Sequence, residues 1–282
     1  MARETLVVNA IGGLCNRMRS IATGVHLAQV SGRRLKVVWH NNSDLAADYS
    51  DLFQTIPDDM DIIYPGNVEY GLKWDIPRMR NLYVSRLYQR ARFAAVFSDA
   101  SGLAEYFDDD KGFCDVIASK RGDILIISGL AVGGFDDEMF RRMFIPSARV
   151  QALIDQKTAG FNSDTVGVHI RRTDNRESIR QSPLELFVTE MADRIKVNDN
   201  VNFFVASDDA EVLHELSDRF GRRVICGDDK VSRRSLEGMM QGAADLWALA
   251  KTREILGSYY SSYTDTAALL GNIPLKVLTA IQ

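Results

Sequence analysis

The sequence predicts an α/β protein with two parallel β-sheets, one in each half of the chain. Short apolar segments rich in β-branched residues alternate with helical patterns along most of its length, which is typical of βαβ units. The chain has 282 residues, of which 46% are hydrophobic and 26% are charged. This is the composition of an ordinary globular protein, and the length suits two hydrophobic cores better than one. We therefore expect two domains of modest size.

The expected strands fall into two series. In the first half of the chain they are residues 6–10, 35–39, 62–64 and 124–128. In the second half they are residues 166–170, 203–207, 223–226, 255–256 and 275–278. The segment 65–122 contains helical pieces without a clean alternation of strand and helix, so no strand is assigned there.

A helix and a turn-rich connector separate the two series. Pro146 can open the helix, and residues 157–164 then supply turn-forming residues. We place the boundary there, which divides the chain into domains of residues 1–158 and 159–282. Further along, residues 232–252 carry apolar side chains at helical spacing and are expected to form a helix packed in the core.

Composition limits the compartment and the partners. A formal net charge of −4 gives no support for binding nucleic acid. Cys15, Cys114 and Cys226 are odd in number and far apart, so neither a disulfide framework nor a metal site is expected. No run of about 18 apolar residues occurs, and the N-terminus lacks a signal-peptide pattern. We expect a cytoplasmic protein, either free or held peripherally at the inner face of the membrane.

The most informative segment is the apolar run 166–170 with the polar residues that follow it. Arg171, Arg172 and Asp174 lie where this strand ends, and ligands of open α/β sheets bind beyond the carboxyl ends of the strands. Two adjacent guanidinium groups, always charged, suit a diphosphate. The alternative is an ordinary arginine pair that is solvated or makes structural ion pairs.

A glycine turn follows the first expected strand. Gly12 and Gly13 allow a tight turn, and the helix after them would direct free amide groups and its positive end at an anion. The segment is neither a G-x-G-x-x-G motif nor a P-loop, so a simple turn is the alternative.

Two more polar segments follow strands of the second half. Asp208 and Asp209 come after residues 203–207, where one of them is expected to cap a helix and the other could accept paired hydrogen bonds from guanine. Residues 257–266, rich in serine, threonine and tyrosine, open another helix. Their hydroxyl groups suit phosphate oxygens, although such caps also occur without a ligand.

Two features of the first half have open interpretations. His40 follows residues 35–39 and is either a catalytic candidate or a packed histidine. The segment 65–122 carries arginines interspersed with tyrosines, namely Arg78, Arg80, Tyr83, Arg86, Tyr88, Arg90 and Arg92. They form either a solvated helix face or a patch for an acidic acceptor or a membrane headgroup.

Taken together, these segments resemble the fucosyltransferase superfamily of α1,2-, α1,6- and protein O-fucosyltransferases. The resemblance rests on the order of the segments 12–17, 169–174, 206–209 and 245–262, and the H-x-R-R-x-D element at 169–174 is its most specific mark. It implies a GT-B-like fold of two Rossmann-like domains with a cleft between them. The N-terminal domain would face the acceptor and the C-terminal domain would hold GDP-fucose, the donor substrate. Transfer would be inverting and metal-independent, without a cofactor.

The resemblance also implies roles for residues of the C-terminal domain. Arg171 would bind the donor diphosphate and offset the charge that grows on the departing GDP. Arg172 would orient the loop. His169 and Asp208 would line the guanine and ribose pocket, and residues 261–262 (Ser261 and Ser262) would contact phosphate.

Two residues of the N-terminal domain, Gly13 and Asn16, would close over the donor. The base for the acceptor hydroxyl is expected to be Glu177, with Asp174 and His40 as alternatives. Glu177 is equally well explained as an exposed carboxylate without a role.

The expected partners are thus a nucleotide-sugar donor and a glycan or lipid-linked glycan acceptor, in polysaccharide biosynthesis by a bacterial enzyme. Two alternatives stay open. The chain could use another nucleotide sugar, or it could be a non-catalytic protein that binds GDP or a glycan on the same scaffold.

Overall fold

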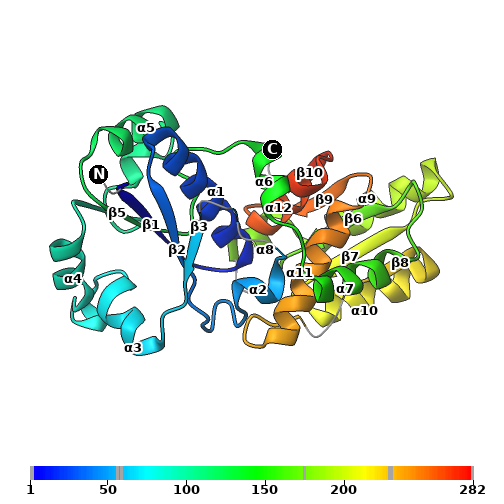
Figure 1. Ribbon diagram of the computed structural model, residues 1–282. Coiled ribbons are helices and arrows are strands. Elements are labelled where there is room, and N and C mark those ends of the chain that lie inside the picture. The colour runs from blue at the N-terminus through cyan, green and yellow to red at the C-terminus, as the bar shows by residue number, and fades with distance from the viewer. Residues whose placement is uncertain (1–2, 55–56, 58–59, 174–175, 228–230, 281–282) are drawn as a thin grey trace. The chain divides into compact units, whose positions relative to one another are not determined.

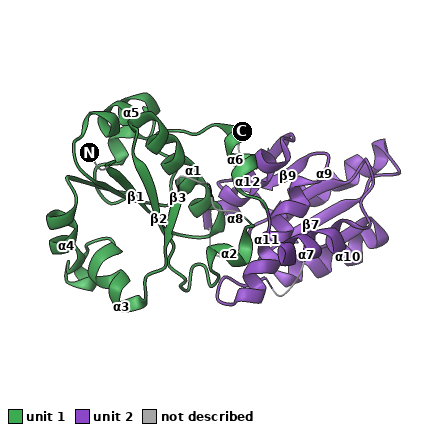
Figure 2. Cartoon of the chain, in the orientation of Figure 1, with its two compact units in different colours: residues 1–145 green, residues 146–282 purple. Residues whose placement is uncertain are grey.

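The computed structural model describes residues 3–54, 57, 60–173, 176–227 and 231–280. The chain forms two compact units, Met1–Ile145 and Pro146–Gln282 (Figure 2). Each unit is built on its own parallel five-stranded sheet, so the predicted α/β class with two sheets is confirmed. The units divide earlier in the chain than the expected 158/159 boundary, because helix α7 (Ala148–Thr158) packs against helix α11 (Leu236–Ala250) of the second unit.

The sheet of the first unit has the strand order β3-β2-β1-β5-β4, with every pair parallel (Figure 1). Its strands are β1 (Thr5–Ala10), β2 (Arg34–Val38), β3 (Met60–Ile63), β4 (Ala95–Ser98) and β5 (Ile124–Ser128). The chain runs outward from β1 to β2 and β3, then returns to the other side of β1. The strand order therefore reverses between β1 and β5, and such a reversal is where open α/β sheets bind ligands.

Strand β4 corrects the expectation that residues 65–122 hold no strand. It pairs with β5 at the edge of the sheet, with Ala95 opposite Ile124. The segment is only four residues long and directly follows an arginine-rich helix, so its apolar run is too short to stand out from a helix end.

Helices and shorter turns cover and extend the first sheet. Helix α1 (Leu14–Ser31) packs on β1 and β2 with one buried face and contacts α5. The other helices are α2 (Tyr49–Leu52), α3 (Asn67–Glu69), α4 (Ser85–Arg92), α5 (Asp110–Ser119) and α6 (Asp137–Met143). The shorter turns are the π-helical η1 (Tyr70–Trp74) and the 3-10 turns η2 (Met79–Asn81) and η3 (Ala104–Tyr106).

The sheet of the second unit has the order β10-β9-β6-β7-β8, again all parallel. Its strands are β6 (Val166–Ile170), β7 (Phe203–Ser207), β8 (Val224–Cys226), β9 (Ile255–Ser258) and β10 (Leu275–Leu278). Here the order reverses between β6 and β9, where His169 lies opposite Gly257. The residues after these two strands therefore share one edge of the sheet.

The helices of the second unit enclose this sheet. Besides α7 and α11 they are α8 (Arg176–Gln181), α9 (Leu184–Val197), α10 (Ala210–Phe220) and α12 (Ser262–Gly271), with the 3-10 turn η4 (Gly221–Arg223) before β8. Apolar residues of β6 and β7 form one core cluster with α9 and α10. Helix α11 is buried along almost its whole length, as its apolar spacing predicted, although it begins at Leu236 instead of residue 232.

Gly257 is the position where the sheet and α12 come closest. A Cβ atom at Gly257 would lie 2.2 Å from Thr264 Cγ2, and Thr264 is fully buried. Because overpacking a core costs about 1–3 kcal/mol, Gly257→Ala should lower the free energy of unfolding in urea by that amount. The matched control is Gly66→Ala, whose Cβ would meet nothing within 4 Å. Equal losses in the two variants would contradict the packing argument.

Candidate functional site

His169 lies at the reversal point of the second sheet. It is 8% exposed, its Nδ1 lies 2.7 Å from Thr264 Oγ1 on α12, and its ring stacks on Tyr263 with centroids 4.7 Å apart. Burial lowers the pKa of His169 to about 4, against the opposing effect of the Asp208 carboxylate. At neutral pH the ring is therefore uncharged and serves as a hydrogen-bonding and stacking group.

The loop after β6 is held by side chains from both neighbouring strands. The backbone N–H of Arg171 donates to Ser258 Oγ of β9 (3.1 Å). On the other side, the Asp208 carboxylate after β7 accepts hydrogen bonds from the N–H of Arg172 (2.6 Å) and from both the N–H (3.1 Å) and Oγ1 (2.6 Å) of Thr173. Charge-assisted bonds of this kind are strong, so Asp208 fixes the loop that carries the two arginines.

The two neighbouring aspartates have different roles. Asp209 is the N-cap of α10, where its side chain accepts from Glu211 N, as was expected of one of the pair. Asp208 binds the loop of β6 instead. Its expected contact with guanine stays a prediction, and the sequence contained no signal for the loop contacts because they join residues far apart in the chain.

The side chain of Arg172 is partly enclosed. Its Nη2 is buried and has no hydrogen-bond partner among the described residues. Burial lowers the pKa of Arg172, while the carboxylates of Glu185 and Asp208 oppose this effect. An enclosed cation beside a fixed loop suits the expected supporting role of Arg172.

The start of α12 lies at the same edge of the sheet. Ser261 is buried and caps the helix, with its Oγ accepting from Thr264 N (3.4 Å). Ser262 is the first helical residue. Tyr260, which precedes the cap Ser261, has a φ of 52° and so lies in the left-handed region where the chain turns into the helix. Because β9 lies next to β6, the free amide groups of this first turn and the loop of Arg171 come from adjacent strands.

The candidate bases of the second unit are less well supported. Glu177 is exposed on α8 and accepts hydrogen bonds from Arg180 (2.5 Å) and Gln181 (3.0 Å). These contacts lower the pKa of Glu177, which makes its carboxylate a weaker base at neutral pH. Asp174 lies outside the described residues.

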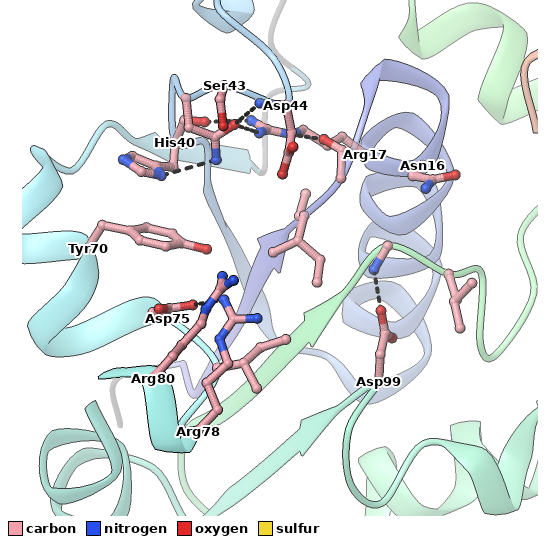
Figure 3. A pocket seen from close by; sticks show the side chains of 17 residues that line it. Asn16, Arg17, His40, Ser43, Asp44, Tyr70, Asp75, Arg78, Arg80 and Asp99 are labelled. Atoms are coloured by element: carbon pink, nitrogen blue, oxygen red, sulfur yellow. Dashed lines mark hydrogen bonds and ion pairs between the residues drawn. The ribbon is translucent and has the colours of Figure 1, made fainter. Parts of the chain in front are cut away.

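A polar cavity of about 500 Å³ opens in the first unit, beyond the carboxyl ends of β1, β2 and β5 (Figure 3). It is lined by Ala10, Ile11, Gly12, Asn16, Arg17, His40, Asn42, Ser43, Asp44, Tyr70, Asp75, Ile76, Arg78, Arg80, Asp99, Gly129 and Leu130. Of the residues predicted for this unit, Asn16 and His40 line the cavity. Gly13 does not, but its extended backbone is the N-cap of α1.

Arg17 organises one wall of the cavity. It is 1% exposed, and its guanidinium donates to Gly12 O (2.9 Å), His40 O (2.8 Å) and Asn42 Oδ1 (3.2 Å). It also lies over the ring of Trp39, 5.0 Å from the centroid. Burial lowers the pKa of Arg17 to about 10, so it stays charged at neutral pH. Arg17 ends the segment 12–17 on which the resemblance rests, but no role was expected for it.

His40 is packed within the same wall. Its Nε2 lies 2.9 Å from Asn67 Oδ1, its Nδ1 lies 3.3 Å from Asn42 Nδ2, and its ring stacks on Tyr70 at 3.9 Å. With both nitrogens engaged, His40 could act as a base only after giving up a hydrogen bond. The glycine turn beside it is confirmed, since Gly12 has a φ of +83°.

The opposite wall comes from the region in which the sequence showed no motif. Tyr70, Asp75, Arg78 and Arg80 belong to η1 and the turns after it (Figure 3). The Asp75 carboxylate binds Arg78 Nη2 (3.0 Å) and Asn81 Nδ2 (2.8 Å). Irregular turns have no periodic pattern, so the sequence contained no signal for Tyr70 and Asp75. Arg78 and Arg80 belong to the arginines for which a solvated face or an acceptor patch was expected.

A third part of the lining is the loop after β5. The Asp99 carboxylate accepts from Ser128 Oγ (2.6 Å) and from the N–H of Gly129 (2.9 Å), and so fixes the loop beside β1. The cavity therefore offers amides, carboxylates and guanidinium groups together. Such a mixture of donors and acceptors suits the hydroxyl groups of a sugar.

Solved fucosyltransferase structures share this fold. NodZ alpha-1,6-fucosyltransferase of Bradyrhizobium, co-crystallised with GDP, is 19% identical over 96% of this chain and 93% of its own, with a TM-score of 0.63. A mutant of Arabidopsis thaliana FUT1 in complex with GDP is 17% identical over 97% and 70%, with a TM-score of 0.62. POFUT1 in complex with GDP is 12% identical over 99% of both chains, with a TM-score of 0.56.

At these identities the likeness establishes a GT-B-like α/β fold, and at that level it confirms the resemblance seen in the motifs. No family model and no curated protein matches the sequence. Within the described part of the chain, no helix is long and apolar enough to cross a bilayer, and no cluster of three or more histidine, cysteine or acidic side chains is placed to hold a metal ion.

The Asp208 contacts can be tested by exchanging single oxygen atoms. In Asp208→Asn, an NH₂ group would face backbone donors, so we expect a loss of about 1–3 kcal/mol in the free energy of unfolding. Asp209→Asn is the matched control, because asparagine caps helices as well as aspartate does. Equal stability of the two variants in urea denaturation would show that the loop does not depend on Asp208.

The low pKa of His169 predicts a pH dependence of stability. Between the ordinary value of 6.5 and the folded value of about 4, the unfolded chain binds more protons, so stability rises with pH. His169→Gln keeps a side chain able to bond Thr264 but removes the titration. When the pH is lowered from about 8 to about 5, the unmodified chain should lose about 2 kcal/mol of its free energy of unfolding through His169, and the His169→Gln variant should not show this loss. Identical pH profiles in urea denaturation would exclude His169 as the cause.

Proposed function

We propose that this chain is a metal-independent, inverting fucosyltransferase that transfers fucose from GDP-fucose to a hydroxyl group of a glycan acceptor. The observation that carries the proposal is the cluster at the β6 edge, where Arg171, a loop held by Asp208 and the start of α12 meet at the reversal point of the sheet. Nucleotides bind at such points. The fold is also that of fucosyltransferases crystallised with GDP.

In this proposal the second unit binds the donor. Arg171 contacts the diphosphate, and the hydroxyl groups of Ser261 and Ser262 contact phosphate oxygens at the positive end of α12. His169 supplies an uncharged ring at the edge of the guanine and ribose pocket. Asp208 adds its carboxylate to that pocket while it fixes the loop.

The reaction breaks the bond between the anomeric carbon of fucose and the diphosphate oxygen. The electron pair leaves with GDP, and the sugar passes through an oxocarbenium-like state. Arg171 offsets the negative charge that develops on the diphosphate, while Arg172 supports the loop. Attack by the acceptor oxygen on the face opposite GDP inverts the anomeric centre.

The first unit binds the acceptor in its polar cavity, with His40 in the wall, while Gly13 and Asn16 contact the donor. The acceptor hydroxyl loses its proton to a carboxylate, either Glu177 or Asp174. Ion pairing with Arg180 keeps Glu177 deprotonated but weakens it as a base, so Glu177 would have to leave Arg180 to accept the proton. A cytoplasmic role in polysaccharide biosynthesis completes the proposal.

The donor assignment is tested by binding and by turnover. We expect GDP and GDP-fucose to raise the melting temperature and UDP and ADP to leave it unchanged. With a glycan acceptor panel, GDP release from GDP-fucose should persist in excess EDTA, and the product should have inverted configuration by NMR. Stabilisation by UDP or ADP instead would point to another nucleotide sugar, and GDP binding without turnover on any acceptor would point to a binding protein.

The same assay tests Arg171. Arg171→Ala should lower kcat on the order of 10²-fold or more, because it removes a group that stabilises the leaving diphosphate in the transition state. The control is Arg222→Ala, an exposed arginine of η4. A variant of Arg171 that retains full kcat would contradict the mechanism.

A further inference from the structure

The turn and helix of residues 79–90 expose large apolar side chains. Met79, Leu82 and Leu87 are 77%, 81% and 80% exposed, and Tyr83 and Val84 beside them are also exposed. Scattered apolar residues on a protein surface are ordinary, but these five lie within nine residues of the chain, and such a concentration of exposed apolar side chains marks an interaction surface. We call residues 79–90 the arginine-rich surface.

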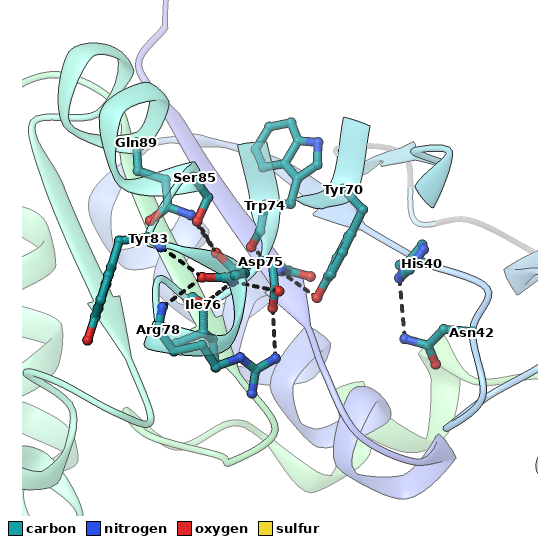
Figure 4. Close-up of polar contacts among 12 residues, drawn as sticks. His40, Asn42, Tyr70, Trp74, Asp75, Ile76, Arg78, Tyr83, Ser85 and Gln89 are labelled. Carbon is teal, nitrogen blue, oxygen red and sulfur yellow. Dashed lines mark hydrogen bonds and ion pairs between the residues drawn. The ribbon is translucent and has the colours of Figure 1, made fainter. Parts of the chain in front are cut away.

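Helix α4 supplies residues 85–90 of this surface; its fully buried side chains are the polar Ser85 and Gln89, and its Tyr88 packs partly buried against the core (Figure 4). Ser85 Oγ donates to Asp75 O (2.7 Å), and Gln89 Nε2 donates to Lys73 O (3.1 Å) and Asp75 O (3.0 Å). Rotating the helix to bury Leu87 would break all three hydrogen bonds. The orientation that exposes the leucine is therefore specified by the structure.

The turn before α4 is strained and also specified. Leu82 and Tyr83 have φ values of 50° and 54°, a conformation that side chains of this kind rarely adopt. Asn81 holds them there, because its Oδ1 accepts from the N–H of Arg78 (2.9 Å) and of Tyr83 (3.2 Å) and its Nδ2 donates to Asp75. Strain that the surroundings maintain in this way points to a function of the turn.

The charge of this segment is opposite to that of the chain. Between residues 76 and 98 there are five arginines and no acidic residue, whereas the chain carries a net charge of −4. Arg78 and Arg92 pair with Asp75 and Asp123. The remaining three make no ion pair with the described residues, namely Arg80, Arg86 and Arg90. Arg80 also lines the cavity, so Arg86 and Arg90 are the two that belong to the arginine-rich surface alone.

We propose that the arginine-rich surface binds an anionic lipid membrane. Exposed leucine and methionine beside unpaired arginines match an interfacial membrane segment, in which the cations contact lipid phosphates and the apolar side chains enter the acyl boundary. Tyr83 has the amphipathic ring suited to the headgroup level. The absence of carboxylates between residues 76 and 98 favours a phosphate-rich surface over a protein partner of mixed charge. The inference goes beyond the transferase proposal and does not depend on it.

Sedimentation of the full-length chain with vesicles tests the proposal. We expect binding to phosphatidylcholine vesicles that contain phosphatidylglycerol, little binding to pure phosphatidylcholine, and a loss of binding as salt is added. Arg86→Gln with Arg90→Gln should weaken binding about 25-fold, from about fivefold for each arginine near an anionic surface. Leu82→Ser with Leu87→Ser should reduce binding at every salt concentration, because it removes the apolar contact.

The controls are an exposed apolar residue and an exposed arginine of the second unit, Val197→Ser and Arg222→Gln; Val197 is 88% exposed. Circular dichroism and the melting temperature establish that each variant is folded. Equal binding to neutral vesicles, no binding to anionic ones, or equal losses in the control variants would overturn the proposal. Self-association that disappears in the leucine variant, without vesicle binding, would assign the surface to a second copy of the chain.

Discussion

The geometry of the candidate donor site depends on the reversal of strand order between β6 and β9. Parallel strands bring their carboxyl ends to one edge, and the reversal places the loop of Arg171 and the start of α12 next to each other. Gly257 permits this, because it lies opposite His169 without a side chain and leaves room for Thr264. The hydrogen bond between His169 and Thr264 then joins the strand to the helix. The residues that pack this edge of the sheet are thus the same ones proposed to bind the donor.

In the first unit the cavity also lies where the strand order reverses, and one of its walls is organised by a buried cation, Arg17. Burying the guanidinium of Arg17 is costly, and the structure offsets the cost with three hydrogen bonds and the face of Trp39. Because those bonds end on Gly12, His40 and Asn42, the same side chain ties the glycine turn after β1 to the loop after β2. The hydrogen bonds that stabilise the buried guanidinium of Arg17 therefore also hold this wall of the cavity in place.

The sequence predicted the elements that have a periodic apolar pattern and the residues that follow directly after a strand, but few of the other features. Apolar runs rich in β-branched residues predicted β1 and β6. Gly12 and Arg171 were then expected at the edge of the sheet because they follow the carboxyl ends of these strands. Strand β4 was missed because four residues at an edge carry too weak a pattern. The contacts of Asp208 with Arg172 also depend on tertiary pairing, which no spacing in one sequence reveals.

Asp75 connects the two features of the first unit that the motifs did not include. Its backbone carbonyl accepts from Ser85 and Gln89 and so orients α4, while its carboxylate binds Arg78 and Asn81 and lines the cavity. The proposed membrane surface and the proposed acceptor cavity therefore share one structural anchor. Given both proposals, an acceptor held at a membrane would reach the cavity without leaving the lipid surface. A lipid-linked glycan has this property, whereas a free sugar gains nothing from the exposed leucines.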